Sequence, residues 1–476
     1  MAPGTDTDST FKLKFNAKPD LVWIKNRDSA ENHVLYDTVR GAYQYIYSNE
    51  QNQSNDGTSL DRGLTKFDFN GFTVKDDLNG GWGVNKDNDD FVAWCWKAGD
   101  ENVQYAADTF TDEVINKSEN WSSTSDLTNS GNLFNDNIWN GATYTASTTR
   151  NITTSSFTAT TIRIRSNGGN EGQTFTVNGT GYAFPTGNNS QTWNEIDLGT
   201  PTTVTSLQVS GTGNFTMYAI EVDGKVLVDS TSSLVFPGLA STVRANSEAG
   251  FSIIQYSGGS EGSVSHGLSS APKFVMVKRT NADNIHWAIY HNSTGSQSIQ
   301  NSGRYYLQFD TNSENLGDTY WGGKNPTDRV INLGTSTSTN TSGGEYIMYA
   351  WHDVPGLQKF GGYTGNNDGN GPYVELGFKP AIVWIKCSGS DQSGNAHWIV
   401  FDTTRSEFNP SSNLFLMNEN HDEYTSADGV VGIDLLSNGF KLRDNNTSRN
   451  AATTYIYCAW AAAPSFNLYG GQSNAR

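Results

Sequence analysis

Short apolar segments dominate the chain, and two of them recur in the same order. The first has proline second and lysine last: KPDLVWIK at 18–25, APKFVMVK at 271–278 and KPAIVWIK at 379–386. The second ends in tryptophan: FVAWCW at 91–96, YIMYAW at 346–351 and YIYCAW at 455–460. The closing lysine and the closing tryptophan are 71, 73 and 74 residues apart in the three cases. This spacing predicts one structural unit that is used three times.

Both recurring segments have the composition of buried strands. They are rich in β-branched and aromatic residues and are bounded by Gly, Asn, Asp and Ser, and no long stretch shows the spacing of an amphipathic helix. In FVAWCW both alternating faces are apolar, which predicts a central strand that is buried on both sides. We therefore expect an all-β protein built of tandem β-sandwich domains of jelly-roll, concanavalin-like type.

The three copies are unevenly spaced, which predicts an insertion. We place copy one at 1–99, an inserted segment at 100–233, copy two at 234–354 and copy three at 355–476. Alternating segments of the insertion, such as TIRIR at 161–165 and TFTVNG at 174–179, predict a distinct β-sandwich. The short connection at 354–356 predicts that copies two and three stack as a semi-rigid rod.

Copy one begins with an abbreviated segment. Copies two and three open with glycine-rich hairpins at 251–268 and 359–378, whereas copy one has only 11–15 at that place. A strand that lacks its neighbour leaves an open edge that tends to pair. We expect a partner chain, an upstream segment or PSFNLYGG at 464–471 to cover it, since the last resembles PGLQKFGG at 355–362.

Composition and charge exclude several classes of partner. Of the 476 residues 12% are aromatic and 49 are glycine, which suits small β domains whose buried area comes from aromatic rings. The net charge of −18 disfavours nucleic acid and anionic lipid. No apolar run is long enough for membrane insertion, and MAPGTDTDST lacks the features of an export signal. The cysteines, Cys95, Cys387 and Cys458, are too few for a disulfide framework, and we expect buried thiols at Cys95 and Cys458.

Catalytic motifs are incomplete, so we predict no catalytic residues. Glu195 and Asp197, like Glu221 and Asp223, match half of the Glu-x-Asp-x-x-Glu strand motif of laminarinase-type glycosidases, and the second glutamate is missing both times. These carboxylates are interpreted as surface residues on alternating strands.

The histidines match no metalloprotease or nucleophile motif. His286-Trp287 and His397-Trp398 occupy equivalent places in copies two and three, which predicts a repeated structural contact.

Metal-binding motifs are incomplete as well, so we predict no metal site and no cofactor. The segment 366–371, NNDGNG, begins like a calcium loop, but Gly377 stands at the twelfth position, where a glutamate would be required. We interpret it as a hairpin turn. Residues 87–90, DNDD, could bind a cation or form a solvated acidic loop.

Aromatic residues in the polar loops of the insertion are the candidate ligand-binding residues. Tryptophan and tyrosine stack on the C–H face of a sugar, and Asn and Asp accept its hydroxyl groups. The candidates are Trp121, Trp139, Tyr182 and Trp193, and each could equally be a core residue. Asn and Gly surround Trp139 and Tyr182, which favours these two.

The repeated motifs resemble a known group. GFSIIQYSGGS and APKFVMVKR in copy two, with LGFKPAIVWIK and YIYCAWAAAP in copy three, resemble concanavalin A-like lectin/glucanase modules of marine bacteriophage tail-fibre and virion proteins. In the insertion, WNEIDLGTPTTVTSLQVSG is similar to galactose-binding jelly-roll modules. The resemblance implies location on the virion, as a tail fibre or external appendage. It further implies other virion proteins and host-surface polysaccharide as partners, and a homo-oligomer such as a trimer.

Three functional hypotheses remain at this point. The first is a non-enzymatic virion or tail-fibre protein that mediates adhesion to host-surface glycan. The second is a polysaccharide depolymerase, which requires two carboxylates about 5 to 10 Å apart in a cleft. The third is a capsid or tail decoration protein with no host contact.

Overall fold

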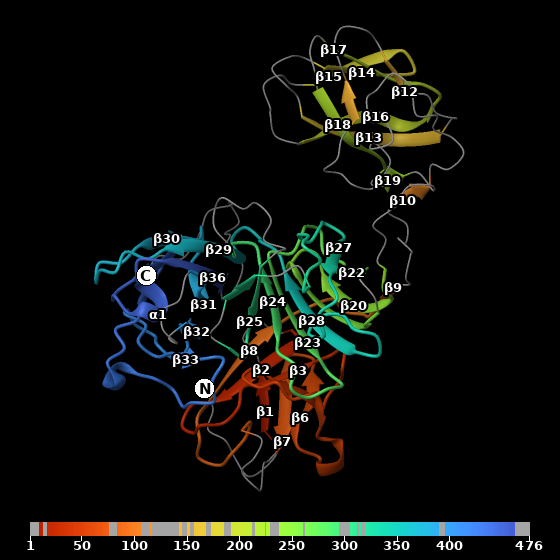
Figure 1. Ribbon diagram of the computed structural model, residues 1–476. Coiled ribbons are helices and arrows are strands. Elements are labelled where there is room, and N and C mark those ends of the chain that lie inside the picture. The colour runs from red at the N-terminus through yellow and green to blue at the C-terminus, as the bar shows by residue number, and fades with distance from the viewer. Residues whose placement is uncertain are drawn as a thin grey trace. The chain divides into compact units, whose positions relative to one another are not determined.

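The computed structural model divides the chain into two compact units, residues 1–107 with 237–476 and residues 108–236. We call them the three-copy unit and the inserted unit (Figure 1). The residues described are 9–12, 17–75, 83–105, 114–116, 142–144, 150–152, 157–167, 173–184, 192–211, 215–223, 225–228, 238–259, 262–294, 305–311, 314–316, 319–389 and 396–461.

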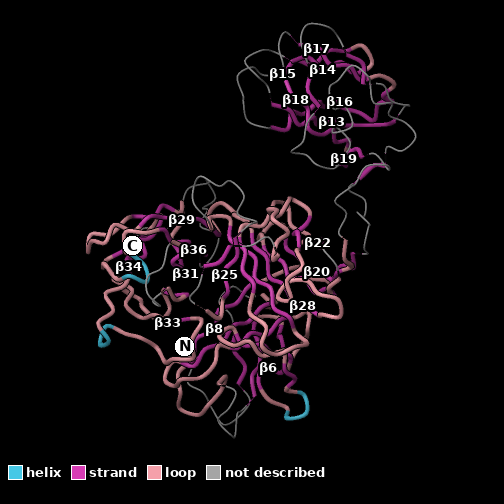
Figure 2. Tube along the Cα trace, in the orientation of Figure 1, coloured by secondary structure: helices cyan, strands magenta, loops and turns pink. Residues whose placement is uncertain are grey.

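The protein is all-β, as its sequence predicts. Figure 2 shows strands and loops almost throughout the described chain. Its helices are single turns: the 3-10 helices η1 (Thr58–Leu60) and η4 (Ser426–Asp428), and α1 (Thr447–Asn450).

Each copy pairs one large sheet with one small sheet. In copy one the large sheet has the order β5 (Asn55–Asp56), β4 (Gln44–Tyr47), β3 (Val34–Asp37), β2 (Leu21–Asn26), β8 (Phe91–Trp96). The small sheet has the order β1 (Ser9–Lys12), β7 (Gly71–Lys75), β6 (Gly63–Asp68). Val22, Tyr36 and Phe72 belong to the apolar core of this sandwich.

Copy two has the most extended sheet. Its order is β26 (Glu314–Leu316), β25 (Tyr305–Gln308), β24 (Ala288–His291), β23 (Phe274–Arg279), β28 (Glu345–Trp351), β21 (Phe251–Ser257), β20 (Ser241–Asn246), β9 (Val103–Tyr105). The small sheet pairs β22 (Gly262–Ser265) with β27 (Val330–Leu333). Strand β9 lies just after copy one, within the predicted insertion at 100–233, so the first residues of that segment belong to the sheet of copy two.

Copy three repeats the arrangement of copy one, with a strand added beside the tryptophan strand and no described counterpart of β5. Its large sheet has the order β29 (Gln358–Thr364), β36 (Thr454–Ala461), β31 (Pro380–Cys387), β32 (Trp398–Asp402), β33 (Phe415–Leu416). The small sheet has the order β30 (Tyr373–Glu375), β35 (Gly439–Leu442), β34 (Ile433–Leu436). The recurring segments are thus β2, β23 and β31 for the first, and β8, β28 and β36 for the second.

The large sheets of all three copies bury their second faces in one shared aromatic core. Trp96, Trp351 and Trp460, which close the three equivalent strands, meet there. Their ring centroids are 6.1 Å (Trp96–Trp351), 5.5 Å (Trp96–Trp460) and 6.1 Å (Trp351–Trp460) apart, at interplanar angles of 70–71°. Edge-to-face packing of this kind is favourable for aromatic rings. The near-equal distances show that the copies surround a common axis.

Two expectations from the sequence are wrong. Copies two and three do not form a rod, because their apolar second faces face the shared core together with that of copy one. The expected burial of FVAWCW (β8) on both faces is also wrong, because Ala93 is exposed; among the described strands β8 pairs with β2 alone. Its counterparts β28 and β36 are central. The pattern of β8 is apolar on both sides, but periodicity does not say whether a neighbouring strand is present.

The inserted unit is a second β-sandwich with its own core. One sheet has the order β10 (Val114–Asn116), β19 (Lys225–Val228), β18 (Phe215–Val222), β13 (Phe157–Asn167), β16 (Thr192–Val204), with β11 (Ala142–Tyr144) paired to β18. The other has the order β12 (Arg150–Ile152), β17 (Leu207–Gly211), β14 (Gln173–Val177), β15 (Thr180–Phe184). Ile162, Phe175 and Ile220 are fully buried in this core.

Candidate functional site

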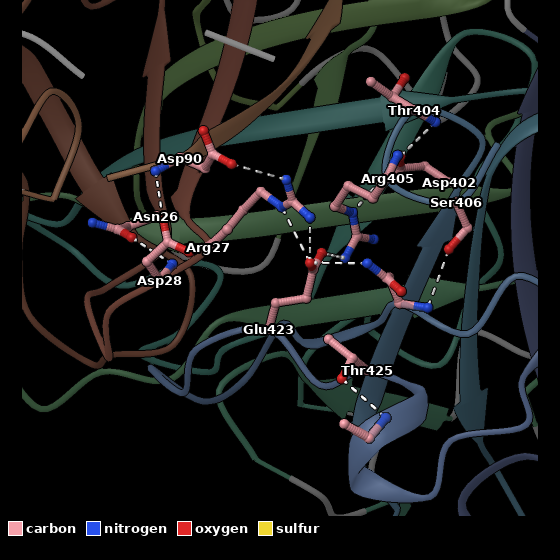
Figure 3. A network of polar contacts seen from close by, with 12 residues as sticks. Asn26, Arg27, Asp28, Asp90, Asp402, Thr404, Arg405, Ser406, Glu423 and Thr425 are labelled. Carbon is pink, nitrogen blue, oxygen red and sulfur yellow. Dashed lines mark hydrogen bonds and ion pairs between the residues drawn. The ribbon is translucent and has the colours of Figure 1, made fainter. Parts of the chain in front are cut away.

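A polar network of the three-copy unit lies between copies one and three. Glu423, whose side chain is 6% exposed, forms an ion pair with Arg27 of copy one and accepts a hydrogen bond from Arg405 Nη1 at 3.0 Å. Asn413 Nδ2 donates to the same carboxylate at 3.0 Å. Figure 3 shows Glu423 between the two guanidinium groups. A buried carboxylate with these donors is an ion-pair centre that holds two copies together.

Asp402 extends this network to a tryptophan of copy one. Arg405 Nε donates to Asp402 Oδ2 at 2.6 Å, and the backbone N–H groups of Thr404 and Arg405 donate to Oδ1. Trp94 Nε1 of copy one donates to Asp402 Oδ2 at 3.1 Å. The Arg405 guanidinium also lies 5.6 Å from the Trp94 ring centroid, within cation–π range.

The junction between copies one and two repeats the same design. Arg40 Nε donates to Asp37 Oδ2 at 2.6 Å, and the backbone N–H groups of Val39 and Arg40 donate to Oδ1. Tyr349, which stands in copy two where Trp94 stands in copy one, donates its hydroxyl to Asp37 Oδ2 at 2.8 Å. An Asp-x-x-Arg turn of one copy thus receives an aromatic donor from its neighbour at both junctions.

The junction between copies two and three is built from neutral groups. His291 takes the place of the aspartate, Thr294 that of the arginine and Cys458 that of the aromatic donor. His291 Nε2 lies 3.2 Å from the Tyr457 carbonyl oxygen, and Ser293 N donates to Nδ1 at 3.1 Å. Nε2 therefore carries the proton, and the imidazole is neutral. Burial lowers the pKa of His291 to about 3.

The pKa shifts at the charged junctions favour the ionised arginines and the neutral tyrosine. Burial lowers the pKa of Arg27 and of Arg40, but the carboxylates of Glu423 and Asp37 outweigh this, and both pKa values are raised. Burial, assisted by the charge of Asp37, raises the pKa of Tyr349 well above its usual value. Tyr349 therefore keeps the proton that it donates.

Each copy also buries the lysine that closes its first recurring segment. Lys25 donates to the Asn26 and Ser29 carbonyl oxygens at 2.7 and 3.2 Å, and Lys278 to those of Ile285 and Glu50. Burial lowers the pKa of Lys25 and of Lys278 to about 8, against the opposing charges of nearby carboxylates. A lowered lysine pKa is frequent at reactive sites. Here the ammonium groups are occupied by backbone carbonyls, which indicates a structural role.

A cavity of about 440 Å³ lies beside β9 and β20 of the three-copy unit. Its lining residues are Asp100, Glu101, Val103, Tyr105, Val243, Ala245 and Gly267. Lys97 Nζ donates to Asp100 at 2.7 Å, and this hydrogen bond lowers the pKa of the Asp100 carboxyl. An acid with a lowered pKa is a poor proton donor at neutral pH. The cavity therefore presents the ring of Tyr105 together with a carboxylate that Lys97 already binds.

The candidate ligand-binding aromatics of the insertion are not brought together by the described structure. Trp121 and Trp139 lie outside the described residues. Trp193 is on strand β16, and its side chain is outside the described part. Tyr182 on β15 is directly opposite Phe175 and is partly buried against the core of the inserted unit. Tyr182 therefore has a packing role, and its ligand-binding role stays a prediction.

The carboxylates of the insertion are engaged in strand contacts. Arg163 Nε donates to Glu221 Oε1 at 2.6 Å, and Arg163 is also opposite Glu195 across the β13–β16 pair. Asp223 accepts from the backbone N–H groups of Thr160 and Thr161. Asp197 Oδ1 accepts from the backbone N–H of Gly199 at 2.7 Å. Glu195, Asp197 and Asp223 are exposed, whereas Glu221 is buried, so the interpretation as a surface carboxylate is wrong for Glu221.

The calcium-like segment at 366–371 forms a turn held by its own side chains. Asn366 Oδ1 accepts from Asp368 N at 3.1 Å, and Asp368 Oδ1 accepts from Asn370 N at 2.7 Å. Asn450 Nδ2, from α1, donates to the Asp368 carbonyl oxygen at 2.8 Å. In the acidic segment 87–90, Asp89 accepts from Asn26 and Ser29. Over the described part of the chain, no group of three or more His, Cys, Asp or Glu residues could hold a metal ion.

The paired histidines make equivalent contacts in copies two and three. His286 Nδ1 lies 2.7 Å from Asp310 Oδ2, and His397 Nδ1 lies 3.0 Å from Asn418 Nδ2. The adjoining tryptophans reach the next copy: Trp287 Nε1 donates to the Tyr47 carbonyl at 2.8 Å, and Trp398 Nε1 to the Gln308 carbonyl at 3.2 Å.

The residues of the charged junctions are not found by motif reasoning. Asp37 and Arg40 are separated by two residues, as are Asp402 and Arg405, and both pairs follow strands at equivalent places. That repeated Asp-x-x-Arg spacing is the sequence signal that could have revealed them. Glu423 has no counterpart motif, because its partner Arg27 is 396 residues away in the chain.

The geometry thus describes an all-β, multi-sandwich protein whose strongest polar centres hold its copies together. Comparison with family models assigns it further: the model of a domain of unknown function, DUF7483, matches residues 2–217 and 229–464. The chain belongs to this family. Comparisons with curated proteins and with solved structures gave no match. Within the described residues, no helix is long and apolar enough to cross a membrane.

Proposed function

We propose that the protein is a non-enzymatic structural and adhesion protein of a bacteriophage particle. The three-copy unit is its scaffold, and the inserted unit contacts host-surface glycan. The observation that carries this proposal is the pairing of β9 with β20, on either side of the insertion. Tyr105 is directly opposite Ser241 and Val103 opposite Val243. The chain therefore leaves the scaffold and returns to it on neighbouring strands, an arrangement suited to presenting a separate module.

The use of charge in the scaffold supports a structural role. Glu423, Asp402 and Asp37 are buried, and each is held by an arginine. A depolymerase would need one carboxyl group free to donate a proton and another free to act as nucleophile or base. The carboxylates of the junctions form ion pairs with arginines that hold the copies together. On a particle that carries many copies of the protein, weak glycan sites act together through avidity.

The experiment replaces residues 108–236 with a short Gly/Ser linker between β9 and β20. Such a linker suffices because Tyr105 and Ser241 are already paired. We expect the variant to keep the thermal unfolding of the three-copy unit and to lose binding to host cells and to their extracted polysaccharide. Unchanged binding would show that the three-copy unit, and not the inserted unit, binds the host glycan. Absence of binding by the full chain, with the protein located inside the capsid by electron microscopy, would reject the proposal.

A reducing-end assay separates adhesion from depolymerase activity. Purified full-length protein is incubated with host polysaccharide, and new reducing ends are counted. We expect none above the level of a heat-denatured sample. Release that disappears in the linker variant would show that the inserted unit is an enzyme, and the non-enzymatic part of the proposal would be wrong.

A further inference from the structure

We propose that residues 467–472 add to the open edge of β8 as an antiparallel strand, so that a segment of the same chain completes the large sheet of copy one. The segment lies outside the described residues. The proposal rests on the edge it would cover, on the order of strands in the other copies and on the geometry of the tryptophans at the axis. It is independent of the proposed adhesion function.

The edge of β8 differs from its two counterparts. Strand β28 lies between β23 and β21, and β36 lies between β31 and β29, whereas β8 pairs only with β2 among the described strands. Ala93 is exposed and Cys95 partly exposed on β8. Their equivalents, Met348 and Ala350 in copy two and Tyr457 and Ala459 in copy three, are at most 4% exposed. The uncovered edge therefore exposes side chains that the other copies bury.

The covering strand of each copy comes from the segment that follows the tryptophan strand of the preceding copy. Strand β29, which covers copy three, follows β28 of copy two. Strand β21, which covers copy two, follows β8 of copy one after β9, the insertion and β20. By the same order, the segment after β36 of copy three is the one that should cover copy one.

The sequence after β36 matches the segment that makes β29 without a gap. WHDVPGLQKFGGYT at 351–364 aligns with WAAAPSFNLYGGQS at 460–473, and the tryptophan, the proline and the two adjacent glycines coincide. Leu357, Gln358 and Phe360 are matched by Phe466, Asn467 and Tyr469. The six-residue connector before the strand has the same length in both segments.

The distances at the axis show that this connector can reach. It must lead from Trp460 to the end of β8 at Trp96, as 352–357 leads from Trp351 to the strand beside Trp460. The Trp460–Trp96 centroid distance is 5.5 Å and the Trp351–Trp460 distance 6.1 Å. Equal connectors over nearly equal spans favour closure within one chain over exchange between two chains.

The register of β29 on β36 fixes the expected pairs. Lys359 is opposite Ala459, Phe360 opposite Cys458 and Gly361 opposite Tyr457. By equivalence, Leu468 would be opposite Cys95 and Gly470 opposite Ala93. Tyr469 would take the place of Phe360, whose ring centroid is 5.5 Å from that of Trp460, and would pack toward Trp96 in the shared core.

The test is a cross-strand disulfide in the full chain. Directly opposite Cα atoms of antiparallel strands are about 4.5 to 5.5 Å apart, within the range that a disulfide spans. Leu468→Cys, oxidised with diamide, should form an intramolecular disulfide with native Cys95, identified by peptide mass spectrometry. Tyr469→Cys is the matched control, because its side chain would point to the opposite face. Leu468→Cys with Cys95→Ser should form no such bond.

The products decide between the possible occupants. A disulfide between two chains would show that a second copy supplies the strand, and equal cross-linking at 468 and 469 would show that there is no fixed register. Either result, or absence of the bond in folded protein, overturns the proposal.

Alkylation of Cys95 gives a second measurement without an introduced cysteine. Removal of residues 462–476 should speed it by about tenfold or more, because protection requires the strand to be bound. Buried Cys387 and Cys458 serve as internal controls for folding. An unchanged rate would contradict the proposal.

Discussion

The junction of copies two and three differs in chemistry from the other two junctions of the scaffold. Copy one meets each neighbour through a buried Asp-x-x-Arg turn and an aromatic donor. Copies two and three meet at the same place through the hydrogen bond of His291 to the Tyr457 carbonyl, and the other two equivalent positions, Thr294 and Cys458, are uncharged. The six-residue connector 352–357 joins copies two and three directly, whereas the insertion separates copies one and two in the chain. Ion pairs are thus present at both junctions of copy one, although residues 97–102 lead directly from β8 into β9 of the copy-two sheet.

The difference between the junctions shows where buried charge is used in the scaffold. A buried ion pair adds little net stability compared with apolar packing, but removal of one partner is costly because the other charge stays buried and unpaired. Such a pair therefore penalises any docking that separates its members. Both junctions of copy one carry such pairs, whereas the junction of copies two and three has the neutral His291 at the equivalent place.

The largest effect should come from Glu423→Ala, which breaks the network between copies one and three. Arg27 would keep only Asp90 and Arg405 only Asp402 as ion-pair partners, and we expect a loss of about 3–5 kcal/mol in the free energy of unfolding because two ion pairs are broken at once. Chemical denaturation measures it. Glu375→Gln, on an exposed strand position, is the control and should change stability by less than about 0.5 kcal/mol. A loss below about 1 kcal/mol for Glu423→Ala would show that the charges do not hold this junction.

An intermediate effect is expected from Tyr349→Phe between copies one and two. The variant removes the hydroxyl that donates to the Asp37 carboxylate at 2.8 Å and leaves the ring in place. Hydrogen bonds to charged groups contribute about 1.5–3 kcal/mol, and we expect a loss in that range in a denaturant titration. Tyr373→Phe, which loses a hydrogen bond to the Asn438 carbonyl on the surface, should cost much less.

The smallest effect concerns the pH dependence of the neutral junction. With a folded-state pKa of about 3, His291 stays neutral in the folded protein while the unfolded chain binds a proton below about pH 6.5. Stability from this group is therefore present above pH 6.5 and is lost as the pH falls toward 3. Between pH 7.5 and 5.5 His291 should account for about 1.4 kcal/mol of that loss.

The variant His291→Asn tests this, since an asparagine oxygen can still accept from the backbone as Asp37 does. Its stability should fall less than that of the wild type between pH 7.5 and 5.5, by about 1.4 kcal/mol. Thr294→Val at the same junction does not titrate and should change stability equally at both pH values. An unchanged pH dependence in His291→Asn would mean that the imidazole takes up a proton in the folded protein.

Much of the scaffold could be predicted from local pattern. The recurring segments predict strands because they are rich in β-branched and aromatic residues. Their near-constant spacing predicts a repeated unit. The insertion could be predicted because its alternating segments lack the two recurring segments of the copies around it. The junction residues could not be predicted, because Arg27, Glu423 and Asp402 meet only when copies far apart in the chain are packed together. Trp121 and Trp139 lie outside the described residues, so their ligand-binding role stays a prediction.

The sequence by itself determined the all-β class, the recurring strands of each copy and the distinct β-sandwich of the inserted segment, because these depend on residues close together in the chain. Only the tertiary structure decided that the copies surround one axis instead of forming a rod, and that β8, unlike β28 and β36, has a single neighbour among the described strands. Both outcomes depend on which apolar face meets which. KPAIVWIK and YIYCAW carry two apolar faces each, and a pattern of that kind requires burial without specifying the partner.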